Sequence, residues 1–142
     1  MFIKLTNGDP ETYSIEQLHQ DNPNVSFPRE IPTKILAEYN VYPLTVADIP
    51  SYNELTEKAV LDTPIEVDGV WIQNYSVVQL PEQEASALCR SVRNDKLSSS
   101  DWTQVADAPV DQTAWATYRQ ELRDITSQEG FPFNIIWPTK PE

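Results

Sequence analysis

Residues 65–72 have the sequence IEVDGVWI, and this stretch decides the character of the N-terminal half of the chain. Apolar residues alternate on both sides of Asp68-Gly69, a pair that supplies the positive φ angles of a two-residue type I′ turn. The pattern predicts a β-hairpin whose four apolar side chains share one face, which we expect to be the core face: Ile65, Val67, Val70 and Ile72.

Strands and short helices alternate in the chain before this hairpin. Residues 1–7 have strand character, and Ser14 with Gln17 forms a capping box that starts a short helix. A second short helix is expected from about Pro32 to Tyr39, with Asn40 as its left-handed C-terminal cap. Residues 41–46 form a further strand, which we expect at a sheet edge because Pro43 has no N–H to donate.

After Pro81 the sequence becomes helical. A helix is expected from about Glu82 to Lys96, with an apolar stripe of Ala85, Leu88, Cys89 and Val92. Asp111 is placed to cap a second helix, about residues 112–127, whose stripe is Trp115, Tyr118, Leu122 and Ile125. Two such helices joined by a short connection pack as an antiparallel hairpin.

These elements predict an α+β protein with two parts. Residues 1–80 form a small strand-rich N-terminal domain with short helices and a β-hairpin. Residues 81–142 form a C-terminal helical hairpin followed by an extended tail. The length of 142 residues suits one ordinary domain or two very small ones.

Composition excludes several classes of function. The chain has 22 Asp and Glu against 10 Lys and Arg, a net charge of −12, so we expect no nucleic-acid partner. No apolar run approaches the length of a membrane span. One Cys and one His cannot build a zinc site, and three glycines cannot build a phosphate loop. We therefore expect no catalytic residues, no metal, no cofactor and a soluble protein of a reducing cytoplasm.

Recognition is the chemistry that remains. Arg119 and Arg123 are one helical turn apart, and they either pair with acids of the preceding segment, such as Asp101 or Asp107, or contact a partner. The apolar segment 131–138 ends on Trp137 and Pro138, and it either packs back on the helical hairpin or forms an arm that binds another chain.

The C-terminal half resembles the module of bacteriophage tail or tail-fibre assembly chaperones. The resemblance covers about residues 86–138 and rests on SDWTQVADAP at 100–109, AWATYRQELRDI at 114–125, GFP at 130–132 and WP at 137–138. The order and spacing of these motifs match the family pattern, although Lys96-Leu97 stands where the family has a Leu-Leu pair. Residues 2–28 are more weakly similar to small phage proteins encoded beside tail fibres.

The resemblance implies a protein that binds a phage tail-fibre or tail polypeptide and assists its folding, oligomerisation or attachment without catalysis. It implies a place in the host cytoplasm during assembly, or on the virion tail in the alternative that the chain is a retained structural component. A homo-oligomer stays open, as do two further alternatives, an acidic DNA mimic and a hydrolase that uses surface carboxylates. The expected partner-binding residues are Trp102, Trp115, Tyr118, Arg119, Arg123, Ile136 and Trp137.

Overall fold

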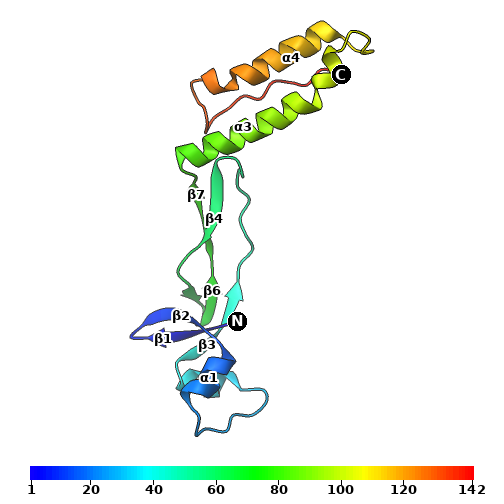
Figure 1. Cartoon of the computed structure of the whole chain (residues 1–142). Helices are drawn as coiled ribbons and strands as arrows, with labels where there is room; N and C mark the ends of the chain where they lie inside the picture. The colour runs from blue at the N-terminus through cyan, green and yellow to red at the C-terminus, as the bar shows by residue number, and fades with distance from the viewer. The chain divides into compact units, whose positions relative to one another are not determined.

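The structure, a computed structural model, describes residues 1–142 and contains two compact units (Figure 1). Unit 1 comprises Met1–Ser51 and Ala59–Val77, and unit 2 comprises Tyr52–Lys58 and Val78–Glu142. The larger sheet and the two short helices lie in unit 1, and the two long helices lie in unit 2. The chain is therefore α+β, as the sequence predicts. None of its helices is both long and apolar enough to cross a bilayer.

A five-stranded sheet organises unit 1. Its strands lie in the order β2 (Asp9–Tyr13), β1 (Phe2–Thr6), β3 (Val41–Val46), β6 (Val70–Gln73) and β5 (Ile65–Val67). All neighbours are antiparallel except β3 and β6, which run parallel. A separate two-stranded sheet pairs β4 (Glu57–Leu61) with β7 (Tyr75–Gln79).

The predicted edge position of the strand at residues 41–46 is wrong, because β3 lies between β1 and β6. Its two partners use different halves of the strand: β1 pairs with Val41–Pro43, and β6 pairs from Leu44 onward. Hydrogen bonds from Leu5 N–H to Asn40 and from Leu44 N–H to Met1 make Phe2–Pro43 a non-hydrogen-bonded pair. The missing N–H of Pro43 is thus not required by β1, and parallel pairing begins only after it.

The hairpin of β5 and β6 has the predicted register. Ile65 pairs with Ile72 and Val67 with Val70, and the turn residues Asp68 and Gly69 have φ angles of 51° and 81°. The expected core face is wrong, however. Ile65, Val67 and Val70 remain 48%, 43% and 48% exposed. The buried cluster of unit 1 consists of Tyr13, Leu18, Leu36 and Val41, so it includes no residue of β5 or β6.

Both short helices of unit 1 form where capping predicts them. Helix α1 (Ile15–Asp21) begins with the full capping box of Ser14 and Gln17. Helix α2 (Thr33–Glu38) is followed by Asn40 at a φ of 56°, the left-handed conformation expected of a C-terminal cap. Leu18 of α1 and Leu36 of α2 are the side chains through which these helices join the buried cluster of unit 1.

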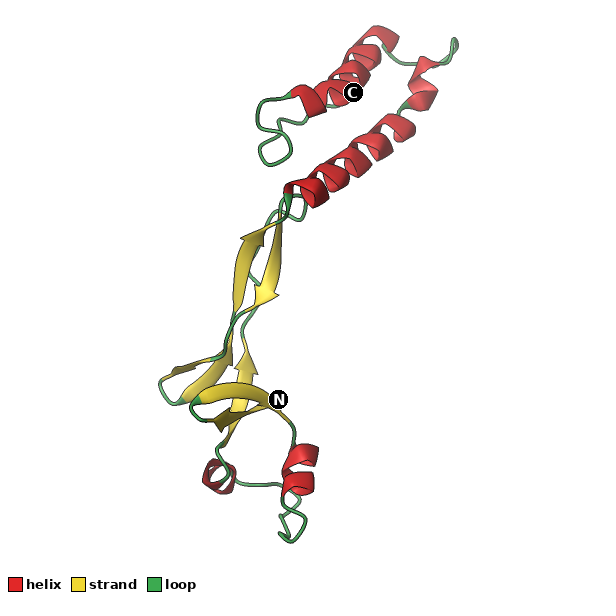
Figure 2. Ribbon diagram, turned by 60° about the vertical axis from the view of Figure 1, so that its left-hand side comes forward, coloured by secondary structure: helices red, strands yellow, loops and turns green.

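Unit 2 contains the two predicted long helices, which lie side by side (Figure 2). Helix α3 (Glu82–Ser99) runs three residues beyond the expected end at Lys96, and Ser100 follows it as C-cap. A 3-10 turn η1 (Asp101–Gln104) leads to α4 (Gln112–Asp124) and a second 3-10 turn η2 (Ile125–Ser127). Asp111 caps α4 by accepting from the N–H groups of Thr113 and Ala114, as predicted.

The predicted stripe of α4 is confirmed, since Trp115, Tyr118, Leu122 and Ile125 are all buried. On α3 the buried face is rotated relative to the prediction. Ala85 and Cys89 are buried, but Leu88 is 37% exposed and Ser86 is buried instead.

The C-terminal segment, residues 128–142, packs back on the helical hairpin of its own chain. Pro132 is fully buried, and its carbonyl accepts a hydrogen bond from Cys89 Sγ at 3.5 Å. Trp137 packs against the cluster of Trp115, Tyr118 and Leu122. Of the two sequence-level alternatives, docking on the hairpin is therefore the one that the structure shows.

Candidate partner-binding surface

Arg119 lies buried at the C-terminal end of α3 and is used inside the module. Its Nη1 donates to the Leu97 carbonyl at 2.6 Å and to Ser100 Oγ at 2.7 Å, and its Nη2 pairs with Asp101 at 2.6 Å. The last carbonyls of a helix have no partner within the helix and carry partial negative charge, so a guanidinium is well suited to this position. Of the two alternatives for this arginine, the structure shows the pairing with Asp101.

The Arg119 contacts fix the turn that presents Trp102. Asp101 and Trp102 are adjacent in η1, and the ring of Trp102 lies 6.2 Å from that of Trp115. Trp102 nevertheless remains 51% exposed. A large aromatic side chain therefore packs on Trp115 while about half of its surface stays accessible to a partner.

Trp115 and Tyr118 are buried aromatic residues that line the same cleft as Trp102. Each is 5% exposed, and their rings meet edge to face at 5.7 Å. Trp115 Nε1 is buried and has no hydrogen-bond partner. The two residues therefore support the surface, and only a small part of each is accessible to a partner.

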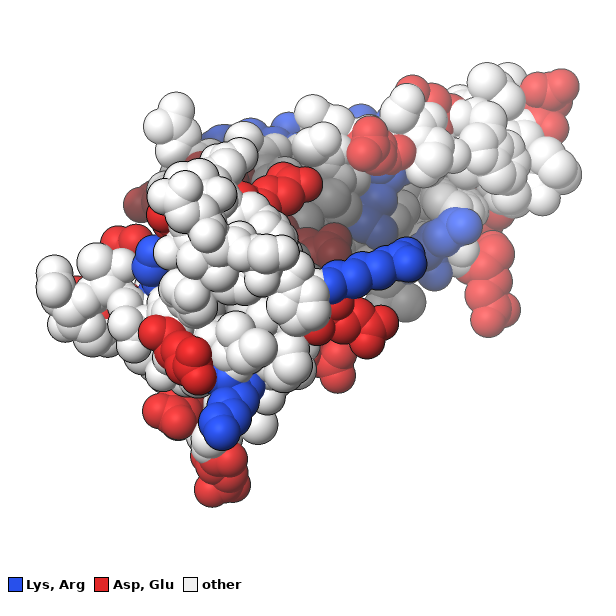
Figure 3. Space-filling model, turned by 90° about the horizontal axis from the view of Figure 1, so that it is seen from below, with Lys and Arg blue, Asp and Glu red and all other residues white.

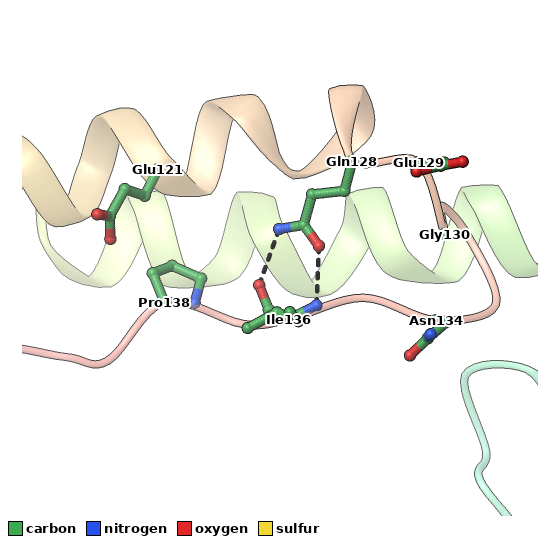
Figure 4. A pocket seen from close by; sticks show the side chains of 7 residues that line it. All are labelled: Glu121, Gln128, Glu129, Gly130, Asn134, Ile136 and Pro138. Carbon is green, nitrogen blue, oxygen red and sulfur yellow. Dashed lines mark hydrogen bonds between the residues drawn. The ribbon is translucent and has the colours of Figure 1, made fainter.

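Ile136 is the most exposed large apolar residue of the C-terminal segment, at 78%. Its backbone is clasped by the side-chain amide of Gln128: Nε2 donates to the Ile136 carbonyl and the Ile136 N–H donates to Oε1, both at 2.8 Å (Figure 4). A groove of about 580 Å³ lies here, with Glu121 and Glu129 among its lining residues. The clasp holds the Ile136 side chain outward without any strand pairing.

Gly130 lies where the C-terminal segment turns back toward the helical hairpin, close to the backbone of Asn134. A Cβ at this position would lie 2.2 Å from the carbonyl oxygen of Asn134, whose own N–H donates to the Gly130 carbonyl at 2.7 Å. Backbone atoms cannot yield at such a distance, so only glycine fits this position.

The remaining expected site residues occupy different environments. Arg123 is exposed and takes part in no ion pair, whereas Trp137 is partly buried beneath Lys96, whose Nζ lies 5.6 Å from the ring centroid. The structure thus brings Trp102, Trp115, Tyr118 and Trp137 together, and it places Ile136 and Arg123 at other parts of the module's surface.

Sequence reasoning missed two lysines. A cleft of about 310 Å³ is lined by Lys96, Ser99, Ser100, Trp102, Trp115, Tyr118 and Lys140. Lys140 lies three residues from the last expected site residue, Trp137, and no helical or strand periodicity connects it to Trp115. Only the docking of the C-terminal segment brings its Nζ to 5.7 Å from the Trp115 ring centroid.

The side chains of Cys89, His19 and the acidic residues occupy environments that the structure describes. No group of three or more His, Cys, Asp and Glu side chains is placed to hold a metal ion. Cys89 is fully buried, and this burial raises the pKa of its thiol. His19 packs edge to face on Phe27 with ring centroids 5.1 Å apart. On the face shown in Figure 3, acidic side chains are scattered among neutral ones and do not form one continuous field.

The comparison with protein families gives this surface its context. Residues 86–142 match the family described as phage tail assembly chaperone protein. The match covers every residue of the cleft and both residues of the Gln128 clasp, so this surface lies wholly within the matched residues. The resemblance predicted for about residues 86–138 is thereby confirmed, and the match extends it to residue 142. No curated protein and no solved structure matches the chain.

Proposed function

We propose that this protein is a tail-fibre assembly chaperone that binds the fibre polypeptide and assists its folding, oligomerisation or attachment by binding alone. The observation that carries the proposal is the family match over residues 86–142, which supports a role in phage tail assembly. The proposal goes further than this match in two respects: it names the fibre as the partner and the host cytoplasm as the place of action.

The exposed apolar side chains of the module support binding as its means of action. Trp102, Val105 and Ile136 are 51%, 52% and 78% exposed. An unassembled subunit of an oligomer exposes apolar surface and aggregates through it. A partner that covers this surface while carrying a net charge of −12 would keep the complex soluble.

Co-expression with the fibre or tail protein encoded beside this chain tests the proposal. We expect co-purification and a higher yield of soluble, oligomeric fibre, measured by size-exclusion chromatography with light scattering. Ile136→Ala should lower that yield, because it removes an exposed contact and no buried one. Ile49→Ala is the matched control, since Ile49 is 60% exposed but lies in unit 1.

A fibre whose yield and oligomeric state do not respond to the wild-type chain would contradict the proposal. Mass spectrometry of purified particles separates a transient chaperone from a structural tail component. Absence from the particle is expected, and stoichiometric presence would favour the structural alternative.

A further inference from the structure

The cleft beside Trp102 combines cations with aromatic walls. Its lining includes two lysines, Lys96 and Lys140, and three aromatic residues, Trp102, Trp115 and Tyr118. Its volume of about 310 Å³ suits one or two side chains and is too small for a folded element. The four parts that build it are α3, η1, α4 and the C-terminal segment, so it forms only when the module is folded.

Both lysines lack an anionic partner. The ion pairs of the chain are Lys4–Asp21 and Arg119–Asp101, so no carboxylate lies within 4.0 Å of Lys96 or Lys140. Each ammonium instead lies over an indole ring, at 5.6 Å from Trp137 and 5.7 Å from Trp115. In a chain with 22 acidic residues, two unpaired cations at one cleft mark a place where negative charge is favoured.

The aromatic walls set a second requirement for a ligand. Trp102 is half exposed, so part of its apolar ring is in contact with water, and burial of that part against a ligand is favourable. An apolar side chain packed on this ring, next to a carboxylate near the lysines, would satisfy both features of the cleft. Polyanions such as nucleic acids fit less well, because the net charge of −12 repels a phosphate backbone.

We propose that the Lys96–Lys140 cleft binds an acidic segment of a partner polypeptide, in which an Asp or Glu carboxylate lies between the two ammonium groups and a neighbouring apolar side chain packs on Trp102. The proposal rests on the proposed function for the identity of the partner, the fibre polypeptide. A second copy of this chain is the less favoured occupant, because two copies that each carry −12 repel one another.

Titration of the full-length, ¹⁵N-labelled chain with synthetic peptides tests the cleft without the fibre. The probes are acetyl-Gly-Asp-Phe-Asp-Gly-amide and its neutral twin, in which Asn replaces both Asp. We expect the acidic probe to shift the indole N–H signal of Trp102 and to bind at least about fivefold more tightly than the twin. Added salt should weaken the acidic probe alone, because it screens exposed charges.

Lysine variants locate the effect. Lys96→Gln and Lys140→Gln should each weaken the acidic probe by up to about fivefold, and the double variant by roughly tenfold. Lys58→Gln is the control, because it removes one positive charge from an exposed lysine outside the cleft. Amide spectra of each variant would show that the fold is retained.

Equal binding of the two probes, or equal effects of Lys58→Gln and Lys140→Gln, would overturn the proposal. So would a dimer that dissociates on Lys140→Gln, because the occupant would then be a second copy. If the double variant loses the acidic probe but still solubilises the fibre as well as wild type, the cleft does not hold the fibre and the chaperone function stands. If the probe binds as expected but the wild-type chain never binds the fibre, the proposed function fails and the preference of the cleft for acidic segments stands.

Discussion

Asp21 joins two groups of unit 1 at a single carboxylate. The Tyr13 hydroxyl donates to Oδ2, and Lys4 Nζ lies 3.3 Å from the same atom. The hydrogen bond from Tyr13, and next that from Lys4, lowers the pKa of Asp21 below its ordinary 3.8. Burial, and next the contact with Asp21, raises the pKa of Tyr13 above 10.0. Burial alone would lower the pKa of Lys4, but its hydrogen bonds outweigh burial and raise it.

Asp21→Asn tests this cluster through pH. A carboxylate whose pKa is lowered in the folded state stabilises that state above the ordinary pKa of 3.8, and this contribution disappears as pH falls through the lower, folded value. The wild type should therefore exceed the variant in urea midpoint at neutral pH, with the difference shrinking in acid below 3.8. At the alkaline end, the raised pKa values of Tyr13 and Lys4 make their contributions disappear as pH rises through those values.

Asp9→Asn is the control for this titration, because Asp9 is an exposed carboxylate on β2, the strand that pairs with the strand of Lys4. A difference between wild type and Asp21→Asn that stays constant from neutral to strongly acidic pH would show that the carboxylate is not held by its neighbours.

At the scale of elements, one side chain joins three of them. Arg119 on α4 binds the last turn of α3 through Leu97 and the turn η1 through Asp101. The contacts connect the helical hairpin to the turn that carries Trp102. A residue that lies 18 positions away from Asp101 in the sequence therefore helps to hold η1 in place.

Arg119→Ala should destabilise the module by about 2–4 kcal/mol, because it removes the three hydrogen bonds of a buried guanidinium and leaves the buried Ser100 Oγ without a donor. Denaturant unfolding measures the loss, and tryptophan fluorescence should report a change around Trp102. Arg123→Ala, one turn further along α4 and exposed, should change stability by less than about 0.5 kcal/mol. Similar losses in the two variants would contradict the role assigned to Arg119.

Arg119→Lys sharpens this comparison. An ammonium retains the charge but cannot bond Leu97, Ser100 and Asp101 at once in the fork geometry of a guanidinium. We therefore expect lysine to recover only a part of the lost stability.

At the scale of the whole molecule, the net charge opposes association of copies of the chain through their exposed apolar side chains. Ile49, Leu61 and Ile136 are each at least 60% exposed, and the three hairpin residues Ile65, Val67 and Val70 add an apolar strand face. With a net charge of −12, copies of the chain repel one another at neutral pH. The charge therefore allows the chain to expose side chains of this kind in solution.

This balance predicts a minimum of solubility near pH 4.3, the isoelectric point of the sequence. Turbidity measured across a pH series should rise near that value and fall on both sides of it. The same protein at neutral pH is the control. A chain that stays clear at its isoelectric point would show that its exposed apolar residues do not associate when repulsion is removed.

Local chemistry determined much of this protein from the sequence alone. The turn pair Asp68-Gly69 fixed the hairpin register, because positive φ angles at both residues allow one pairing. The caps Ser14 and Asp111 placed two helix starts, and the spacing from Trp115 to Ile125 placed the buried stripe of α4. Motif spacing also predicted a resemblance to tail assembly chaperones over about residues 86–138, and the family comparison matches residues 86–142. That residues 1–80 and 81–142 are separate domains, and that the seven expected residues bind a partner, stay predictions.

Only the tertiary structure decided which faces are covered and which charges meet. The hairpin pattern could not show that its apolar face is left open, because burial depends on what packs against a strand as well as on the strand itself. The sequence offered acids such as Asp101 and Asp107 as partners of Arg119, and the position of η1 selected Asp101. Lys140 reached Trp115 only because the C-terminal segment folds back. Contacts between residues distant in the chain depend on the packing of whole elements, which no local periodicity encodes.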